Sequence, residues 1–315
     1  MSKSIVTNRR LSAQLHSNSS GVKYYSPLSI MRLVAFLIMP FLFFSLSCTQ
    51  EKERLLFSSS RNGNSDIFLM DADGNTKTAL THSEFEEWGP TWINENEISL
   101  LRQIEDSILR VKLNLKTKKE TSLKHPKNCL LDDKNVLYAN HLAVYPCKKD
   151  IFIVNSVTNQ MTNITSNLEG MANYPSWSHD GKSVLFTSNH LGRNQLFQYQ
   201  IDSKEIKQLT YSDSNNERGE LSPNGRFLVY SSDYFEKGNQ DIVLQELESG
   251  AIKNLSKSPG MELIARFSND GKKIFFGTNK DENWEIYAID LETENQVRLT
   301  SNTEFDGDPR VFKFR

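Results

Sequence analysis

Short runs in which apolar and polar residues alternate recur along most of the chain. Examples are VLFTS (184–188), FLVYSS (227–232) and EIYAID (285–290), and each has the period-two pattern of a β-strand. Groups of these runs end on Leu-Thr or a close equivalent, with the hydroxyl residue at Thr81, Thr165, Thr210, Ser256 and Thr300. From Thr165 onward the endings are 45, 46 and 44 residues apart, and the 84 residues between Thr81 and Thr165 make two units, with the missing ending near Leu123. The pattern therefore predicts one structural unit repeated along the chain.

Each unit contains four strands joined by turns, which is typical of one blade of a β-propeller. The 268 residues from Cys48 to Arg315 accommodate six units, so the sequence predicts an all-β, six-bladed propeller of four-stranded antiparallel blades over residues 55–315. One apolar position in each first strand is expected to pack between blades, and it is assigned to Trp92, Cys129, Trp177, Leu221, Phe267 and Val311. Because Val311 lies in DPRVFKF, we expect the C-terminal strand to complete the first blade and close the ring.

Asp-Gly or Asn-Gly pairs mark the turns of the predicted blades. They occur at 73–74, 180–181, 224–225 and 270–271, where a two-residue hairpin turn needs positive φ. The stretch DADGN (71–75) begins like an EF-hand loop but lacks the Glu at the twelfth position, so it is predicted to be a hairpin turn.

One turn carries a family resemblance. Pro175, Trp177, Ser178, Asp180, Gly181 and Lys182 fit the P-x-W-S-x-D-G-K core of the WD40-like repeat of the TolB type, and residues 221–225 and 267–271 repeat it less fully. The chain thus resembles the TolB-like family of β-propeller proteins. The resemblance implies the propeller fold and a binding scaffold in the bacterial envelope, but propellers host unrelated activities.

The first part of the chain has the pattern of an export signal. Residues 1–30 show no periodic apolar pattern and are interpreted as an unstructured extension or a misassigned start, and residues 31–47 are predicted to be a signal peptide. Cys48 follows a small residue, which resembles a bacterial lipobox in which that cysteine is lipidated; an ordinary cleaved signal is the alternative. Residues 48–54 would then be a lipidated linker. We expect a monomer anchored by its lipid at the periplasmic or cell-surface face of the outer membrane.

Composition and motifs exclude several function classes. The net charge of -2, without a long run of Lys or Arg, gives no footprint for nucleic acid. The sequence contains no G-x-S-x-G, no H-E-x-x-H and no Gly-rich phosphate loop. We therefore predict no catalytic residues and no cofactor.

Binding is predicted at one end of the propeller. Antiparallel strands place the Asp-Gly turns at one end, termed the turn mouth, and the loops 82–89, 189–195, 232–241, 278–285 and 302–308 at the other, termed the loop mouth. Varied loops on a rigid scaffold are the usual place for binding. Candidate residues for an envelope protein, peptide or glycan are Glu86, Glu87, Trp88, Tyr174, Arg193, Glu217, Arg218, Tyr234, Glu262, Asp281, Trp284, Asp306 and Arg310.

Histidines support an alternative function. His82, His125, His141 and His190 are all expected at the loop mouth, where converging imidazoles would bind a transition metal. Oligogalacturonate lyases are similar in outline, being propellers with a histidine-bound metal. The alternative is therefore a metal-dependent propeller lyase or hydrolase acting on an oligosaccharide.

Cys129 and Cys147 are predicted to be free thiols. If Cys129 lies mid-strand at the position of Trp177, Cys147 lies beyond the far end of the neighbouring strand. Four residues at roughly 3.3 Å each separate the two by about 13 Å, which exceeds the roughly 7 Å Cα limit for a disulfide.

Overall fold

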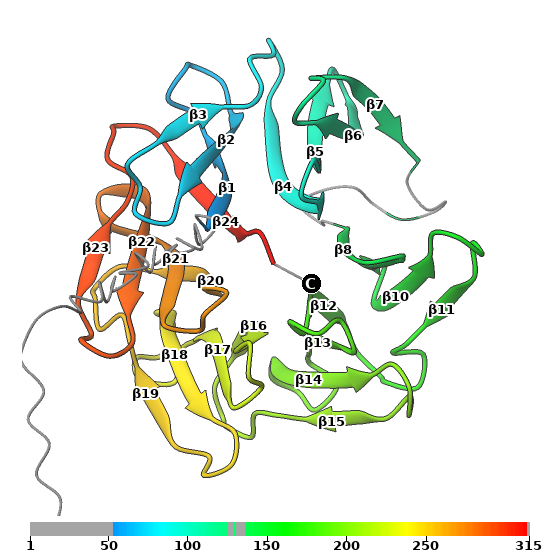
Figure 1. Cartoon of the computed structure of the whole chain (residues 1–315). Helices are drawn as coiled ribbons and strands as arrows, with labels where there is room; N and C mark the ends of the chain where they lie inside the picture. The colour runs from blue at the N-terminus through cyan, green and yellow to red at the C-terminus, as the bar shows by residue number, and fades with distance from the viewer. Residues whose placement is uncertain (1–52, 125–128, 130–135, 314–315) are drawn as a thin grey trace, which may run out of the picture. The chain divides into compact units, whose positions relative to one another are not determined.

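The computed structural model describes residues 53–124, 129 and 136–313. These residues form six four-stranded antiparallel sheets arranged around a centre (Figure 1). The predicted leader, the predicted lipidation site Cys48 and His125 lie outside the described residues. None of the described residues forms a helix with the length and hydrophobicity needed to cross a membrane.

The six sheets are the predicted blades, and the strands of each follow one another from the innermost outward. The first three blades are β24 (Asp306–Val311), β1 (Arg54–Ser59), β2 (Asp66–Asp71), β3 (Lys77–Ala79); β4 (Glu87–Asn94), β5 (Glu97–Ile104), β6 (Ser107–Asn114), β7 (Glu120–Leu123); and β8 (Leu137–Ala139), β9 (Leu142–Cys147), β10 (Asp150–Asn155), β11 (Met161–Asn163). The last three are β12 (Ala172–Trp177), β13 (Ser183–Ser188), β14 (Gln195–Gln200), β15 (Ile206–Gln208); β16 (Asn216–Leu221), β17 (Phe227–Ser232), β18 (Asp241–Glu246), β19 (Ile252–Asn254); and β20 (Glu262–Phe267), β21 (Lys273–Asp281), β22 (Asn283–Asp290), β23 (Gln296–Arg298).

The C-terminal strand closes the ring, as predicted. β24 pairs antiparallel with β1, with Val311 opposite Leu55 and Asp306 opposite Ser59. The red strand therefore lies beside the blue one at the inner edge of the first blade (Figure 1). The indole Nε1 of Trp92, in the second blade, donates to the Arg310 carbonyl at 2.9 Å, which joins the closing strand to its neighbour.

The predicted first-strand register is correct in five blades and wrong in the third. Trp177 lies opposite Val184, and Leu221, Phe267, Val311 and Trp92 hold the corresponding place in their blades. In the third blade that place belongs to Leu137, which lies opposite Val144. Cys129 precedes β8 in the connection from β7 and lies 37 residues after Trp92, whereas Leu137 lies 45 residues after it, as the repeat spacing requires.

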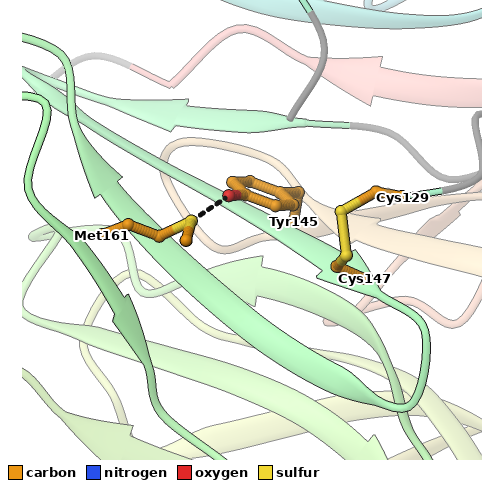
Figure 2. Close-up of a disulfide and its surroundings, with 4 residues drawn as sticks. All are labelled: Cys129, Tyr145, Cys147 and Met161. Carbon is orange, nitrogen blue, oxygen red and sulfur yellow. Dashed lines mark hydrogen bonds between the residues drawn. A yellow bond between two sulfur atoms is a disulfide. The ribbon is translucent and has the colours of Figure 1, made fainter. Parts of the chain in front are cut away.

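The same register error explains why the prediction of free thiols is wrong. Cys129 and Cys147 form a disulfide with their Cα atoms 4.9 Å apart (Figure 2). Cys147 is the last residue of β9, so both cysteines lie on the loop-mouth side of the third blade. Tyr145 of the same strand donates its hydroxyl to Met161 Sδ of β11 at 3.1 Å.

The Asp-Gly turns are longer than predicted. Gly181, Gly225 and Gly271 have φ of 68°, 70° and 72°, so the expected left-handed position is present. Each turn, however, spans the residues between a strand ending at Trp177 and one beginning at Ser183, or their equivalents, and only its Gly has positive φ. In the first of these turns, the Ser178 hydroxyl donates to Asp180 Oδ1 at 2.7 Å and accepts the Ser183 N–H at 2.9 Å. The DADGN stretch is a turn between β2 and β3, as predicted.

The hydroxyl residues of the Leu-Thr endings form hydrogen bonds with the third strand of their blades. In five blades the hydroxyl accepts an N–H of the third strand at 2.8 to 3.0 Å, from Ile67, Ile151, Leu196, Ile242 and Ile286. In three of these blades the hydroxyl also donates to an Asp at the start of that strand, at 3.0 to 3.3 Å. The preceding Leu, such as Leu209 or Leu299, is buried between blades. The repeated dipeptide therefore anchors the outer strand and seals the interface.

Candidate functional site

A β-bulge interrupts the innermost strand of five blades. The ladder register shifts there, and a residue in the left-handed region faces each shift: Gly89, Tyr174, Arg218, Ile264 and Asp308, with φ between 50° and 60°. Left-handed backbone is unfavourable for a β-branched residue such as Ile264. Bulges next to binding sites commonly redirect side chains.

A second ring of residues lies on the same strands, two positions after the bulge residues and closer to the turn mouth. Thr91 and Ser176 donate their hydroxyls to backbone carbonyls of the next blade, at 3.1 Å to Val136 and 2.6 Å to Gly219. At the equivalent place in the fifth blade, Glu220 Oε1 accepts the Phe267 N–H at 2.9 Å. These hydrogen bonds connect the inner strands of neighbouring blades around the channel.

The bulges and the second ring enclose a cavity of about 270 Å³. The lining consists of Trp88, Leu137, Pro146, Asn173, Tyr174, Pro175, Ser176, Arg218, Gly219, Leu263, Ile264, Arg266, Asp308 and Arg310. Trp88 and Asn173 lie near the starts of their strands, so the cavity occupies the loop-mouth side of the channel. Its apolar and aromatic walls around a few charged groups are typical of ligand sites.

Three arginines supply most of the charge in the cavity lining. Arg218 stacks on the Tyr174 ring, 4.0 Å from its centroid, and Arg218 Nη1 lies 2.8 Å from Glu217 Oε2. Arg266 is only 7 % exposed, and its Nε lies 3.6 Å from Glu220 Oε2. Burial, together with repulsion by Arg310, lowers the pKa of Arg266.

The end of the described chain lies at the turn-mouth side of the channel. Lys313 Nζ donates to Glu220 Oε1 at 3.0 Å and to the Phe267 carbonyl at 2.6 Å. Phe312 packs edge-on against Trp92, with ring centroids 4.9 Å apart. Phe312 and Lys313 line a smaller cavity of about 110 Å³ on this side, which shares Arg266 and Arg310 with the larger one.

The structure brings only some of the predicted binding residues together. Trp88, Tyr174, Arg218 and Arg310 line the cavity. Glu87, Glu262 and Asp306 are buried in hydrogen-bond networks beneath the loops, and Glu217 lies behind Arg218. The remaining predicted residues do not line the cavity: Glu86, Arg193, Tyr234, Asp281 and Trp284.

Asp281 and Trp284 lie in a region where the expected loop is a continued β-ribbon. β21 and β22 extend to Asp281 and Asn283 and are joined at Glu282, whose φ is 80°. Trp284 lies against Gly277 of the same sheet. These two side chains belong to the outer part of the blade.

Arg266, Asp308 and Ile264 line the cavity but do not stand out in the sequence. The sequence nevertheless contained a pattern that points to them. Relative to the apolar position assigned in each first strand, such as Trp177, the bulge residue always lies three positions earlier and the second-ring residue one position earlier. Arg266 thus precedes Phe267 as Arg310 precedes Val311. The channel-facing positions could have been identified from the register alone.

The described histidines do not converge. His141 lies in the β8–β9 turn and therefore at the turn mouth, which corrects the prediction that it lies at the loop mouth. His82 is exposed, and His190 packs against Phe197 with centroids 4.7 Å apart. Within residues 53–124, 129 and 136–313, no group of three or more His, Cys, Asp or Glu side chains is placed to hold a metal ion.

Comparison with known proteins agrees with the repeat pattern. The model of the TolB beta propeller domain matches residues 139–234, which span the third and fourth blades and enter the fifth. This part of the propeller is similar to the TolB propeller. The Tol-Pal system protein TolB of Wolinella succinogenes is 23% identical over 124 residues, which are 39% of this chain and 29% of that protein. The TolB-type match therefore covers less than a third of that relative.

Solved structures show the same fold over more of the chain. TolB from Acinetobacter baumannii superposes with a TM-score of 0.71 at 17% identity, covering 82% of this chain and 66% of that one. An oligogalacturonate lyase in complex with manganese gives a TM-score of 0.54 at 14% identity, covering 76% and 87%. At these identities the likeness concerns the fold.

Proposed function

We propose that this chain is a non-enzymatic binding scaffold of the bacterial envelope, which holds a segment of a partner protein at its loop mouth. The observation that carries the proposal is the cavity formed by the inner-strand bulges, where aromatic and arginine side chains converge. Such side chains are the usual anchors of protein interfaces. The relatives of the TolB type, described as Tol-Pal system proteins, favour a protein over a glycan.

The envelope location has support of two kinds. The leader pattern of residues 31–47 and the lipobox-like Cys48 favour export and lipid anchoring at the outer membrane. The Cys129–Cys147 disulfide favours an oxidising compartment, since disulfides persist outside the cytosol. The two arguments are independent because they rest on different parts of the chain.

Site-specific photo-cross-linking in the source bacterium tests the proposal. A photoreactive phenylalanine at Tyr174 or Tyr234, which are 37% and 48% exposed, should yield one defined adduct. The matched turn-mouth positions Lys182 and Asn224 should yield none, and Trp88→Ala should weaken the loop-mouth adduct. A partner captured equally from the turn mouth would contradict the proposed site.

The alternative of a metal-dependent lyase or hydrolase rests on likeness of fold to the manganese-bound oligogalacturonate lyase. No arrangement among the described histidines adds to it, since His141 and His190 lie at opposite mouths. The binding scaffold is therefore the function that the geometry supports best.

A further inference from the structure

We propose that the cavity is a carboxylate cradle, in which Arg218, Arg266 and Arg310 receive an acidic side chain from the partner segment. The inference rests on the proposed function and deepens it by naming the chemistry that the loop mouth recognises. It follows from how the charges around the cavity are paired, buried and approached.

The side chains that line the cavity carry three positive charges and one negative charge. Arg218 is paired with Glu217, while Glu220 is shared between Arg266 and Lys313. Arg310 and Asp308 also line the cavity and add one charge of each sign. The lining itself therefore holds three guanidinium groups and one carboxylate, Asp308, which favours an anionic ligand.

The burial of these arginines destabilises the folded protein when no anion is bound in the cavity. Arg310 Nε is buried and has no hydrogen-bond partner among the described residues. Burial lowers the pKa of Arg310, and burial with repulsion by Arg310 lowers that of Arg266. A buried guanidinium with an unsatisfied donor is destabilising, and a carboxylate would supply the missing charge and acceptors.

The cavity walls favour a carboxylate carried on an apolar stem. Trp88, Leu137, Pro146 and Ile264 provide hydrocarbon surface beside the guanidinium groups. The Tyr174 ring under Arg218 fixes the plane of that guanidinium, and a fixed guanidinium binds carboxylate in a defined geometry. The methylene groups and single charge of a Glu or Asp side chain match these walls better than a fully hydrated anion does.

The direction of approach favours a peptide segment. Trp88 and Asn173, near the loop-mouth ends of their strands, line the larger cavity, so a ligand can enter it between the long loops. Exposed Tyr234 and Phe235 stand in one of those loops, with ring centroids 5.1 Å apart. A peptide that places its acidic side chain in the cavity would have its neighbouring residues at this rim.

Calorimetric titration of the purified full-length protein tests the cradle. The probe is the capped tripeptide acetyl-Ala-Glu-Ala-amide, with the Gln analogue as its neutral match. The Glu peptide should bind and the Gln peptide should bind at least about tenfold more weakly, since hydrogen bonds to charged groups are the strong ones. Equal binding of the two peptides would overturn the inference.

Variants separate a role in recognition from a role in folding. Arg310→Gln should weaken binding of the Glu peptide by about tenfold or more, while Asp308→Asn, which removes the opposing charge, should tighten it several-fold. Arg226→Gln is the control, because Arg226 is exposed at the turn mouth and paired with Glu246. A structural role alone would not produce the gain at Asp308, so absence of that gain together with unchanged binding by Arg310→Gln would overturn the cradle.

Other anions serve as competing probes. Galacturonate binding in place of the Glu peptide would assign the site to an acidic glycan. Inorganic phosphate binding as tightly as the peptide would show an unselective anion site. Either result overturns the peptide cradle.

The test of the cradle is distinguishable from the test of the proposed function. Cross-linking at Tyr174 without carboxylate selectivity leaves the scaffold standing, whereas peptide binding without loop-mouth adducts contradicts the scaffold.

Discussion

At the scale of single residues, buried carboxylates beneath the loop mouth make stability depend on pH. Glu262 is fully buried: its Oε1 accepts from Ser258 and Thr278, and its Oε2 has no hydrogen-bond partner among the described residues. Burial, with a further contribution from Asp241, raises the pKa of Glu262. Its stabilising contribution is therefore complete below the pKa of the unfolded chain and is lost as pH rises through the folded-state pKa.

Glu262→Gln removes this ionisation, so the variant should gain stability over the parent protein as pH rises from acid to neutral. Chemical unfolding at several pH values measures the difference. Glu246→Gln is a control of opposite sign, because Ser249 and Arg226 lower the pKa of the exposed Glu246 by hydrogen bonding. A Glu262→Gln variant whose advantage shrinks with rising pH would contradict the assignment.

At the scale of elements, the disulfide ties the third blade together. This blade has the short innermost strand β8, and Cys129 links the segment before β8 to the end of β9. Closing a loop of 18 residues stabilises a protein by about 3 kcal/mol in the chain-entropy model. The double variant Cys129→Ser with Cys147→Ser should therefore unfold at a lower temperature than the parent protein.

Reducing agent provides the control for the disulfide. It should lower the unfolding temperature of the parent protein and leave the double variant unchanged. Mass spectrometry of the non-reduced protein should also find a peptide linked through Cys129 and Cys147. Two alkylatable thiols at these positions in protein isolated from the source bacterium would refute the bridge.

At the scale of the whole molecule, β24 closes the ring, so removing it should affect every blade. Deletion of residues 308–315 takes away Val311 opposite Leu55 and the Arg310 carbonyl that accepts from Trp92. The exposed edge of β1 and the lost burial should lower the unfolding free energy by several kcal/mol or prevent folding. Thermal unfolding measures the loss, and an unchanged melting temperature would show that β24 is dispensable.

Complementation distinguishes a missing strand from a general disturbance. A synthetic peptide of residues 304–313 should restore part of the melting temperature of the truncated protein by adding a strand to its edge. A scrambled peptide of the same composition should have no effect. Equal recovery with both peptides would contradict specific closure by β24.

The sequence by itself determined the fold, because the blades repeat a period-two pattern, to which four add an Asp-Gly or Asn-Gly turn and five a Leu-Thr type ending, and these features act locally. It also placed Trp92, Trp177, Leu221, Phe267 and Val311 correctly, since a large apolar residue must be buried between blades. The register failed at Cys129, which lies 37 residues after Trp92, whereas the residue that holds the place, Leu137, lies 45 residues after it and keeps the spacing of the later blades.

Only the tertiary structure decided which residues form the site. The bulges at Tyr174, Arg218 and Asp308 rotate side chains from separate blades into one cavity, while Trp284 and Arg193 remain outside it. Local pattern cannot show this convergence, because Arg218, Arg266 and Arg310 lie more than forty residues apart and meet only when β24 closes the ring. The fold depends on contacts between neighbouring strands, whereas the site is formed by residues that meet across the channel.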